Sequence, residues 1–219
     1  MAHAEVFHGS LDVGEAEVAR LTHLLSVEER ERAARFHFAR DRRRFVVRRA
    51  RLREVLGTAT AERLVYTENV YGKPRLSNNA VRFSATHSGD TWAIAISSVE
   101  VGLDIEAHDT AVDWRDLAAG LFGANEIAAL HALPEAEARH AFFDVWARKE
   151  AFVKAIGMGL SYPLDAFEVS AGHDARLIAG ADGWAITRLD LSANYGAALV
   201  LADDGSPVDV TLRAALVAA

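Results

Sequence analysis

The hydrophobic period of the sequence changes from helical to extended twice, and this repeated order constrains the fold most. Residues 26–57 carry apolar side chains at helical spacing, and residues 63–108 contain short alternating runs typical of strands. Residues 113–159 are helical again, with a long helix expected to begin near Pro134 and to end at Gly157 or Gly159, and are followed by further strand-like runs. Helices followed by strands in each half predict a pseudo-duplicated α+β fold. We expect two similar α+β subdomains, residues 1–101 and 102–219, with a cleft between them.

The first helical segment is rich in arginine, with eleven Arg residues between positions 30 and 53. Ser26 followed by two acidic residues predicts the helix start, and Gly57 predicts its end. A break near Asp41 would divide the segment into two helices. Three of its arginines share one stripe at helical spacing: Arg44, Arg48 and Arg51.

Composition narrows the function classes. The chain has no cysteine, which excludes disulfide frameworks, thiolate zinc sites, iron–sulfur ligation and thiol nucleophiles. Its formal net charge of −7 argues against non-specific binding of nucleic acid. No apolar run reaches the roughly 18 residues of a membrane helix, and the N-terminal residues do not resemble a signal peptide. We expect a cytoplasmic protein with no nucleic-acid or membrane partner.

Two carboxylates stand out in the segment VGLDIE. Asp104 and Glu106 are two residues apart, so on a strand they share one face, roughly 7 Å apart along the backbone. Val101, Leu103 and Ile105 would point to the other face. A carboxylate pair of this kind suits magnesium, which binds one or two carboxylates together with substrate phosphates. An exposed strand edge with ordinary charges is the alternative.

A second group of charged residues lies in the helical segment WARKEAFVK. Trp146, Glu150 and Lys154 are four residues apart and share one helix face, with Lys149 beside it. A Glu followed by Lys four residues later is also an ordinary stabilising pair. However, the chain contains only three lysines, and two of them lie here.

Two short polar segments complete the set. In FSATHSGD, His87 lies between Thr86 and Ser88, and a bend with hydroxyls and free backbone N–H groups could hold a phosphate. In YGKPRL, Lys73 and Pro74 form a rigid turn that is not a Walker A loop. Each segment alone is more often an ordinary surface turn. The remaining histidines lack the spacing of a zinc site.

Taken together, the four segments resemble the 4′-phosphopantetheinyl transferase superfamily. The order YGKP, FSATHS, VGLDIE and W-x-x-K-E-A-x-x-K is similar to its longer, monomeric, surfactin-synthetase-activating type, over residues 25–167. The resemblance implies an enzyme that moves 4′-phosphopantetheine from coenzyme A to a serine of an acyl, polyketide or peptidyl carrier protein. It also implies Mg²⁺ as cofactor, with Mn²⁺ as an alternative, and release of adenosine 3′,5′-bisphosphate.

The resemblance further implies a role for each matched residue. Asp104, Glu106 and Glu150 would bind the metal ion. Glu150 would also act as the base for the carrier serine, and Lys154 would stabilise or protonate the leaving pyrophosphate oxygen. The expected contacts of coenzyme A are Arg40, Arg44, Lys73, Pro74, Thr86, His87 and Lys149. Trp146 and Glu126 would support the site.

Two departures from the family pattern affect the nucleotide end. Thr86 stands where the family often has Ser, so the hydroxyl is kept but a methyl group narrows the space. Glu28 and Glu29 stand where these members often have Lys, so the 3′-phosphate would depend on Arg32, Arg40 and Arg44.

Contact with the carrier must use a local surface, because carrier proteins and this chain are both acidic. Trp114, Leu121 and Phe122 are candidates for that contact, and core packing is the alternative. Two further functions remain open: a magnesium-dependent phosphohydrolase of coenzyme A or a nucleotide, and a non-catalytic protein that binds coenzyme A or a carrier.

Overall fold

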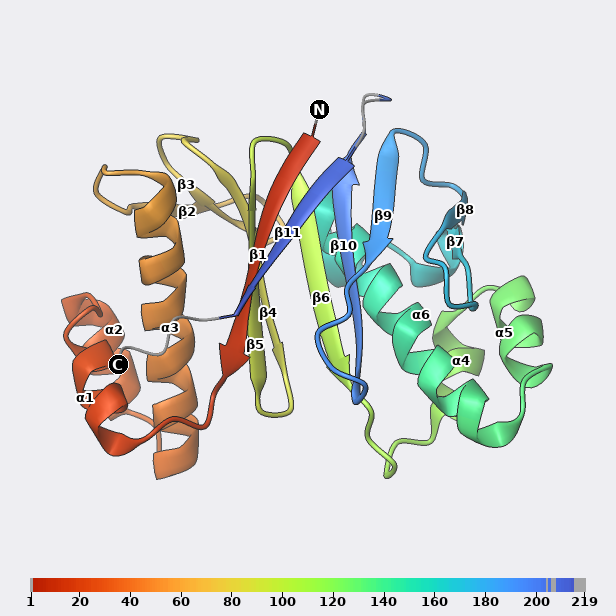
Figure 1. Cartoon of the computed structure of the whole chain (residues 1–219), viewed down its shortest axis with the longest axis horizontal. Coiled ribbons are helices and arrows are strands. Elements are labelled where there is room, and N and C mark those ends of the chain that lie inside the picture. The colour runs from red at the N-terminus through yellow and green to blue at the C-terminus, as the bar shows by residue number, and fades with distance from the viewer. Residues whose placement is uncertain (1, 204, 206–207, 215–219) are drawn as a thin grey trace.

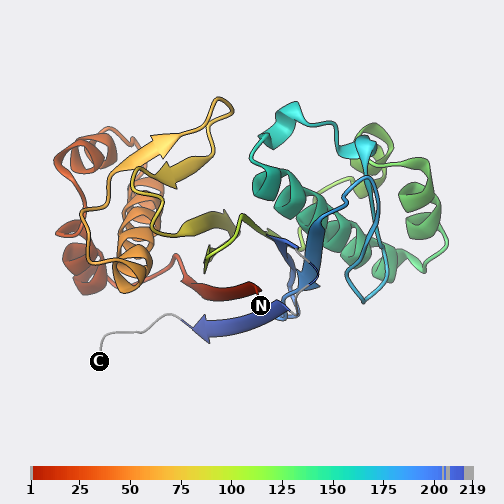
Figure 2. The ribbon, with the colours of Figure 1, turned by 90° about the horizontal axis from the view of Figure 1, so that it is seen from above.

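Two β-sheets occupy the middle of the molecule, and helices cover their outer sides (Figure 1). The computed structural model describes residues 2–203, 205 and 208–214. The first sheet has the strand order β11-β1-β5-β4 and the second has the order β6-β10-β9. Seen from above, the layers follow one another as helices, sheet, sheet and helices (Figure 2). The α+β class expected from the sequence is confirmed.

The first half consists of the four-stranded sheet, three helices and a small hairpin. Its strands are β1 (Ala2–Ser10), β4 (Arg82–Ser88), β5 (Thr91–Ser97) and β11 (Val208–Ala214). Its helices are α1 (Glu15–Thr22), α2 (Val27–Ala34) and α3 (Ala39–Ala59), and the hairpin is β2 (Tyr66–Glu68) with β3 (Pro74–Leu76). Apolar side chains of the helices and of β4 and β5 form one core, which includes Phe45, Leu52, Leu56, Phe83 and Ile94.

The boundaries of the arginine-rich helices differ in part from those expected. Ser26 caps α2 as predicted, because its side chain accepts from the Glu29 N–H and the Glu29 side chain accepts from the Ser26 N–H. The break lies at residues 35–38, before Asp41, and Gly57 lies inside α3. Residues 57–59 are exposed, and the helix continues to Ala59 because one glycine costs only about 1 kcal/mol and the Thr60 N–H still donates to the Leu56 carbonyl.

The second half consists of the three-stranded sheet, three helices and several short elements. Its strands are β6 (Val101–Ala107), β9 (Trp184–Arg188) and β10 (Tyr195–Ala202). Its helices are α4 (Trp114–Leu121), α5 (Ala124–His131) and α6 (Glu135–Ile156). Its short elements are the 3-10 turns η1 (Gly159–Ser161) and η2 (Leu164–Ala166) and the strands β7 (Glu168–Val169) and β8 (Leu177–Ala179). Helix α6 begins after Pro134 and ends at Gly157, whose φ of 74° is left-handed, as the sequence predicts.

A third core joins the two sheets. Val101, Leu103 and Ile105 of β6 point into it, together with apolar side chains of β1, β5 and β10. Asp104 and Glu106 therefore point to the opposite face of β6, toward α6, as the alternation predicts.

Strand β11 connects the halves in a way that the sequence does not predict. It pairs in parallel with β1, from Ala2 opposite Val208 to His8 opposite Ala214. Strand β1 itself is absent from the expected elements, although the buried Ala4 and Val6 alternate with His3 and Glu5. The expected division at residues 101 and 102 coincides with the start of β6, but β11 returns to the sheet of the first half. None of the described helices is long and apolar enough to cross a membrane.

Candidate active site

The site forms where α6 lies directly on β6 and β10, and two glycines allow this close approach. A Cβ atom on Gly102 would lie 1.9 Å from the Ala151 carbonyl oxygen and 2.3 Å from the Ala155 nitrogen. A Cβ atom on Gly196 would lie 2.6 Å from the Phe143 carbonyl oxygen. Only glycine fits at these two positions, and the resulting contact brings residues 150–154 next to the carboxylates of β6.

Asp104 is the buried centre of this arrangement, with an exposed fraction of 2%. Its Oδ1 accepts from the Lys154 ammonium at 2.5 Å and from the Thr86 hydroxyl at 2.8 Å. Its Oδ2 is buried and has no hydrogen-bond partner among the described residues. Burial raises the pKa of Asp104, and the Lys154 charge opposes that shift. An unpartnered buried carboxylate oxygen is costly, so this atom is suited to bind a ligand that the protein does not itself supply.

Two further carboxylates lie near Asp104. Burial and then the negative charge of Asp104 raise the pKa of Glu106 to about 7, and the Ser88 hydroxyl donates to Glu106 at 3.0 Å. Burial and the Asp104 charge also raise the pKa of Glu150. Like charges this close disfavour full ionisation unless a cation is added.

The donor chemistry of this carboxylate group fits a hard divalent cation. Asp104, Glu106 and Glu150 offer only oxygen ligands, and Asp104 Oδ2 has no other partner among the described residues. Within the described part of the chain, no three acidic or histidine side chains surround a single point. In this structure Asp104 and Glu106 each direct one oxygen to a neighbour, Lys154 and Ser88 respectively.

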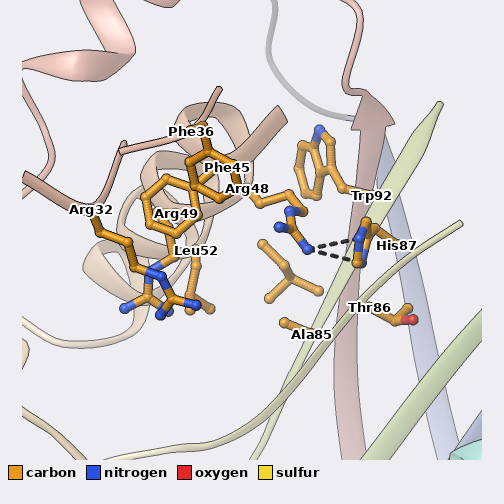
Figure 3. Close-up of a pocket in the computed structure, with 11 residues that line it drawn as sticks. Arg32, Phe36, Phe45, Arg48, Arg49, Leu52, Ala85, Thr86, His87 and Trp92 are labelled. Atoms are coloured by element: carbon orange, nitrogen blue, oxygen red, sulfur yellow. Dashed lines mark hydrogen bonds between the residues drawn. The ribbon is translucent and has the colours of Figure 1, made fainter. Parts of the chain in front are cut away.

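A basic cavity of about 270 Å³ lies beside the carboxylates, between α2, α3 and β4 (Figure 3). Arg48 reaches from α3 to the ring of His87 on β4, with Nη1 2.7 Å from Nε2. Burial, followed by the charges of Arg48, Lys154 and Arg44, lowers the pKa of His87 to about 4. A neutral imidazole beside arginines leaves the cavity with a net positive charge, which suits a phosphate. The cavity is lined by Arg32, Phe36, Phe45, Arg48, Arg49, Leu52, Ala85, Thr86, His87, Trp92 and Ile94.

A second cavity of about 220 Å³ lies between the hairpin and α6. Tyr71, Lys73 and Pro74 of the hairpin line one side, and Lys154 and Gly157 line the other. Ala85 borders both cavities, and Thr86 borders the basic cavity while contacting Asp104 and Lys154. A phosphate held near His87 and a group that reacts beside Lys154 could therefore belong to one extended ligand.

Comparison with known proteins agrees with this arrangement. Residues 100–200 match the model of the 4′-phosphopantetheinyl transferase superfamily. The chain is 32% identical over 171 residues to the 4′-phosphopantetheinyl transferase ffp of Bacillus subtilis, covering 75% of each chain. It is 30% identical over 167 residues to psf-1 of Bacillus pumilus, covering 73% of this chain and 70% of the relative. It is also 29% identical over 204 residues to HetI of a Nostoc species, covering 89% and 86%.

The chain belongs to the 4′-phosphopantetheinyl transferase superfamily. It is an enzyme that transfers phosphopantetheinyl groups, and this family uses coenzyme A as substrate and acts on carrier proteins. The resemblance inferred from four short segments is thereby confirmed.

The structure brings most of the residues expected for phosphopantetheinyl transfer to the same region. Asp104, Glu106, Glu150 and Lys154 lie together, and Thr86 touches two of them. Arg44 lies on α3 and forms an ion pair with Asp90. Arg40 is exposed in the first turn of α3, whereas Arg32 lines the basic cavity.

The prediction that Thr86 and His87 lie in a bend is wrong. Both residues lie within strand β4, and the turn is limited to Gly89 and Asp90. On a strand, Thr86 and His87 point to opposite faces. This explains why Thr86 touches the carboxylate group while His87 faces the arginines of α3.

Lys149 was expected to contact coenzyme A, but its side chain is completely buried and cannot reach a ligand. Its ammonium lies 2.8 Å from Glu126 and donates to the carbonyls of Leu164 at 2.6 Å and Phe167 at 2.9 Å. Glu126 also accepts from the N–H groups of Gly123 and Val169. The pair joins α5, α6 and the segment around β7, so it supports the second half from the side away from the carboxylates.

The Lys73 ammonium is also occupied by protein acceptors. It donates to Glu100 at 3.0 Å, to the Val101 carbonyl at 3.1 Å and to the Ala155 carbonyl at 2.9 Å. Lys73 and Pro74 line the second cavity, but the charge of Lys73 is not presented to a ligand there.

The apolar residues expected to contact a carrier are mostly core residues. Trp114 and Phe122 are buried against α6, and only Leu121 is partly exposed. Leu117, on the exposed side of α4, is 38% exposed.

Sequence reasoning also missed the part played by Arg48 and Arg49. Both line the basic cavity, and Arg48 makes its contact with His87. The four-residue spacing of Arg48 from Arg44 was the available signal, but it could not show that this stripe faces His87. Glu29, unlike an exposed anion, is bonded to Arg49 and Arg53 and thereby orients them.

Proposed function

We propose that the enzyme binds coenzyme A across its two halves and transfers the phosphopantetheine arm to the serine of an apo carrier protein. The first half, residues 1–101, would bind the nucleotide end and its phosphates. The second half, residues 102–219 without β11, would carry the metal ligands and the catalytic residues. The two neighbouring cavities support this division, because both are bordered by Ala85 and they lie between the arginines of α3 and Lys154 of α6.

The phosphate contacts in this proposal come from the basic cavity. Arg48 and His87 lie within hydrogen-bonding distance of each other, and Arg32 and Arg49 line the same space. Arginine binds phosphate with two parallel N–H donors, which favours it for this role. Arg44 is available once a phosphate competes with its exposed partner, Asp90.

The metal site in this proposal consists of Asp104, Glu106 and Glu150. Their mutual repulsion and the unpartnered Asp104 Oδ2 favour binding of a divalent cation, for which Mg²⁺ is the natural choice. Such an ion, when bound, neutralises charge on the pyrophosphate of the substrate.

The reaction itself needs one base and one group that stabilises the leaving oxygen. Glu150 would accept the proton of the carrier serine as its oxygen bonds to the phosphorus attached to pantetheine, and its raised pKa makes it a stronger base. The bond from that phosphorus to the bridging pyrophosphate oxygen breaks. Lys154, whose side chain is 31% exposed, would stabilise the negative charge that develops there. Adenosine 3′,5′-bisphosphate then leaves.

One observation carries the assignment of these roles. Asp104 connects the two halves, because Thr86 of the first half and Lys154 of the second donate to the same oxygen. Its other oxygen stays without a partner among the described residues, beside two carboxylates of raised pKa. This oxygen, together with the two neighbouring carboxylates, can therefore bind a cation that the protein does not itself supply.

Intact-protein mass spectrometry tests the proposal directly. The enzyme is mixed with an apo acyl or peptidyl carrier, coenzyme A and magnesium, with and without a chelator. We expect the carrier to gain the mass of one phosphopantetheine, and the gain to disappear with the chelator. Glu150→Gln should abolish the gain, whereas Glu137→Gln, an exposed acid on the same helix, should leave it unchanged.

The other outcomes identify the alternatives. Adenosine bisphosphate released without any gain on several carriers would indicate a hydrolase. Binding of coenzyme A without gain or release would indicate a non-catalytic protein. A gain that survives in Glu150→Gln would overturn the assignment of the base.

We also propose that the enzyme acts as a monomer, because a single chain brings together every residue assigned above. Light scattering at the enzyme concentration of the transfer assay checks this. A dimer that loses activity on dilution would contradict it.

A further inference from the structure

The turn of the small hairpin is fastened to the C-terminal end of α6. The Asn69 side-chain amide donates to the Gly157 carbonyl at 2.7 Å, and the Lys73 ammonium donates to the Ala155 carbonyl at 2.9 Å. Figure 2 shows the loop between β2 and β3 extending toward this end of the helix. These contacts connect segments that are more than 80 residues apart in the chain.

The turn is shaped for this contact. The Asn69 side-chain carbonyl accepts from the N–H groups of Tyr71 and Lys73, each at 2.9 Å. Gly157 completes the fit, because a Cβ atom there would lie 2.9 Å from the Asn69 amide nitrogen and 3.0 Å from Lys73 Cδ. The tight turn therefore holds both donors directly against the helix end.

The Lys73 ammonium has three acceptors, which is the number of its N–H donors. Two are carbonyls, from Val101 at the start of β6 and from Ala155 in the last turn of α6. The third is the Glu100 carboxylate. The last carbonyls of a helix lack partners within the helix and carry partial negative charge, so a lysine there is stabilising. The side chain is 10% exposed, which keeps these bonds largely out of water.

From these contacts we propose that Asn69 and Lys73 act as positioning residues for the transfer reaction. We call the two side chains the hairpin latch. The latch joins the hairpin to the two elements that carry the site, since Val101 begins the strand of Asp104 and Ala155 follows Lys154. It fixes where Lys154 lies relative to the half that would bind the phosphates of coenzyme A. This inference rests on the function proposed above.

The latch and a direct coenzyme A contact by Lys73 predict different kinetics. Loss of the latch shifts Lys154 relative to a substrate whose phosphates remain bound elsewhere, so kcat falls while affinity for coenzyme A is kept. Small misplacement of reacting groups lowers rates by roughly a hundredfold. Loss of a direct contact would instead weaken coenzyme A binding.

The absence of cysteine from the chain allows a sharp test. In Lys73→Cys the new thiol is unique, and alkylation with 2-bromoethylamine rebuilds an ammonium at the length of lysine. We expect Lys73→Cys to lower kcat roughly ten- to a hundredfold, with the Kd for coenzyme A within about threefold of wild type. Aminoethylation should restore kcat to within about threefold, whereas alkylation with neutral iodoacetamide should not.

Asn69→Ala is the matched variant, because it removes the other donor of the latch without changing charge. It should lower kcat in the same direction and keep coenzyme A affinity. Combined with Lys73→Cys it should add less than the sum of the two effects, since both act on one contact. Asn69→Ala keeps the test decisive if Lys73→Cys does not fold.

The outcomes separate the latch from the other possibilities. A tenfold weaker Kd for coenzyme A with unchanged kcat would show a direct contact and overturn the latch. Unchanged kcat in Asn69→Ala, or no recovery in folded, fully aminoethylated Lys73→Cys, would also overturn it. Wild-type enzyme that transfers nothing to any carrier would instead reject the proposed function.

Discussion

Two lysines of helix α6, five residues apart, pair with acids on opposite sides of the helix. Lys149 is fully buried with Glu126 and donates to two backbone carbonyls. Lys154 is 31% exposed, and its partner Asp104 is 3% exposed at the side chain. Both pairs are short, at 2.8 Å and 2.5 Å. Distance alone therefore does not tell which pair carries chemistry.

The two pairs differ in whether any hydrogen-bonding atom is left without a partner. Around Lys149 the acceptors match the donors, and both Glu126 oxygens are bonded. Around Lys154, Asp104 Oδ2 has no partner among the described residues, and neighbouring carboxylates repel one another. A saturated pair supports the fold, whereas an unsaturated pair open to a cavity is prepared for a ligand.

The largest effect is expected when the charge of Lys154 is removed. We call the surroundings of Lys154 and Asp104 the open side of α6. Lys154→Met should lower kcat for transfer by roughly 10²–10³, because the leaving oxygen loses its cationic partner. Its melting temperature in the absence of metal should also fall, because the buried Asp104 carboxylate loses its cation and keeps only the Thr86 hydroxyl. Steady-state kinetics and thermal unfolding measure the two quantities. A variant with wild-type kcat would remove Lys154 from the mechanism.

The matching change at the fully buried pair of Lys149 and Glu126 should lower the stability of the fold. Lys149→Met leaves Glu126 buried without its cation, which should lower the free energy of unfolding by about 3–5 kcal/mol. Urea denaturation measures this loss. Adding Glu126→Gln should recover part of it, because the uncompensated charge is removed. A loss below about 1 kcal/mol would mean that water or rearrangement satisfies Glu126.

A metal ion should stabilise only the open side. At ten times its Kd, a ligand specific for the folded state adds about 1.4 kcal/mol, which raises the melting temperature of a chain this size by roughly 3–5 °C. We expect Mg²⁺ to produce such a rise in wild type and not in Asp104→Asn. Lys149→Met, if it is folded, should retain the rise. An equal shift in Asp104→Asn would place the ion elsewhere.

An effect of similar size tests whether the polar site around Lys154 extends to His87. Its pKa is lowered to about 4 in the folded state, so the unfolded state binds more protons between about pH 4 and 6.5. The stability linked to His87 is present above pH 6.5 and is lost as pH falls toward 4. For this half-buried group we expect about 1–2 kcal/mol after solvent screening.

The measurement compares wild type with His87→Gln in urea at several pH values. The comparison is needed because Glu106, with its pKa raised to about 7, has the opposite sign and loses stability as pH rises from about 4.5 to 7. Parallel pH profiles for the two proteins would contradict the lowered pKa of His87.

Patterns among residues that are neighbours in sequence were sufficient to predict the strand and the helix on which the site is built. The alternation in VGLDIE placed Asp104 and Glu106 on one face, and Pro134 and Gly157 bounded α6. These features depend on neighbours in sequence, so the sequence alone determines them. The family resemblance supplied the roles of Glu150 and Lys154, which spacing could not provide.

Tertiary contacts decided the features that sequence reasoning missed. The face of α6 that holds Lys149 is buried under α5 and the segment around β7, and nothing near Lys149 in sequence indicates this. The family resemblance implied that Lys73 contacts coenzyme A, and the sequence did not show its acceptors, Val101 and Ala155, because both are distant in sequence. Gly102 was seen only as part of a strand, although it sets the distance between β6 and α6.

The return of β11 to the first sheet also orders the events of synthesis. When β5 leaves the ribosome, β1 still lacks its parallel neighbour, which begins at Val208. At translation rates of about 5–20 residues per second, the roughly 110 intervening residues take about 6–22 s to make. During that time one edge of β1 is open to pairing with other chains. The first half of the molecule is thus completed only after the second half has been synthesised.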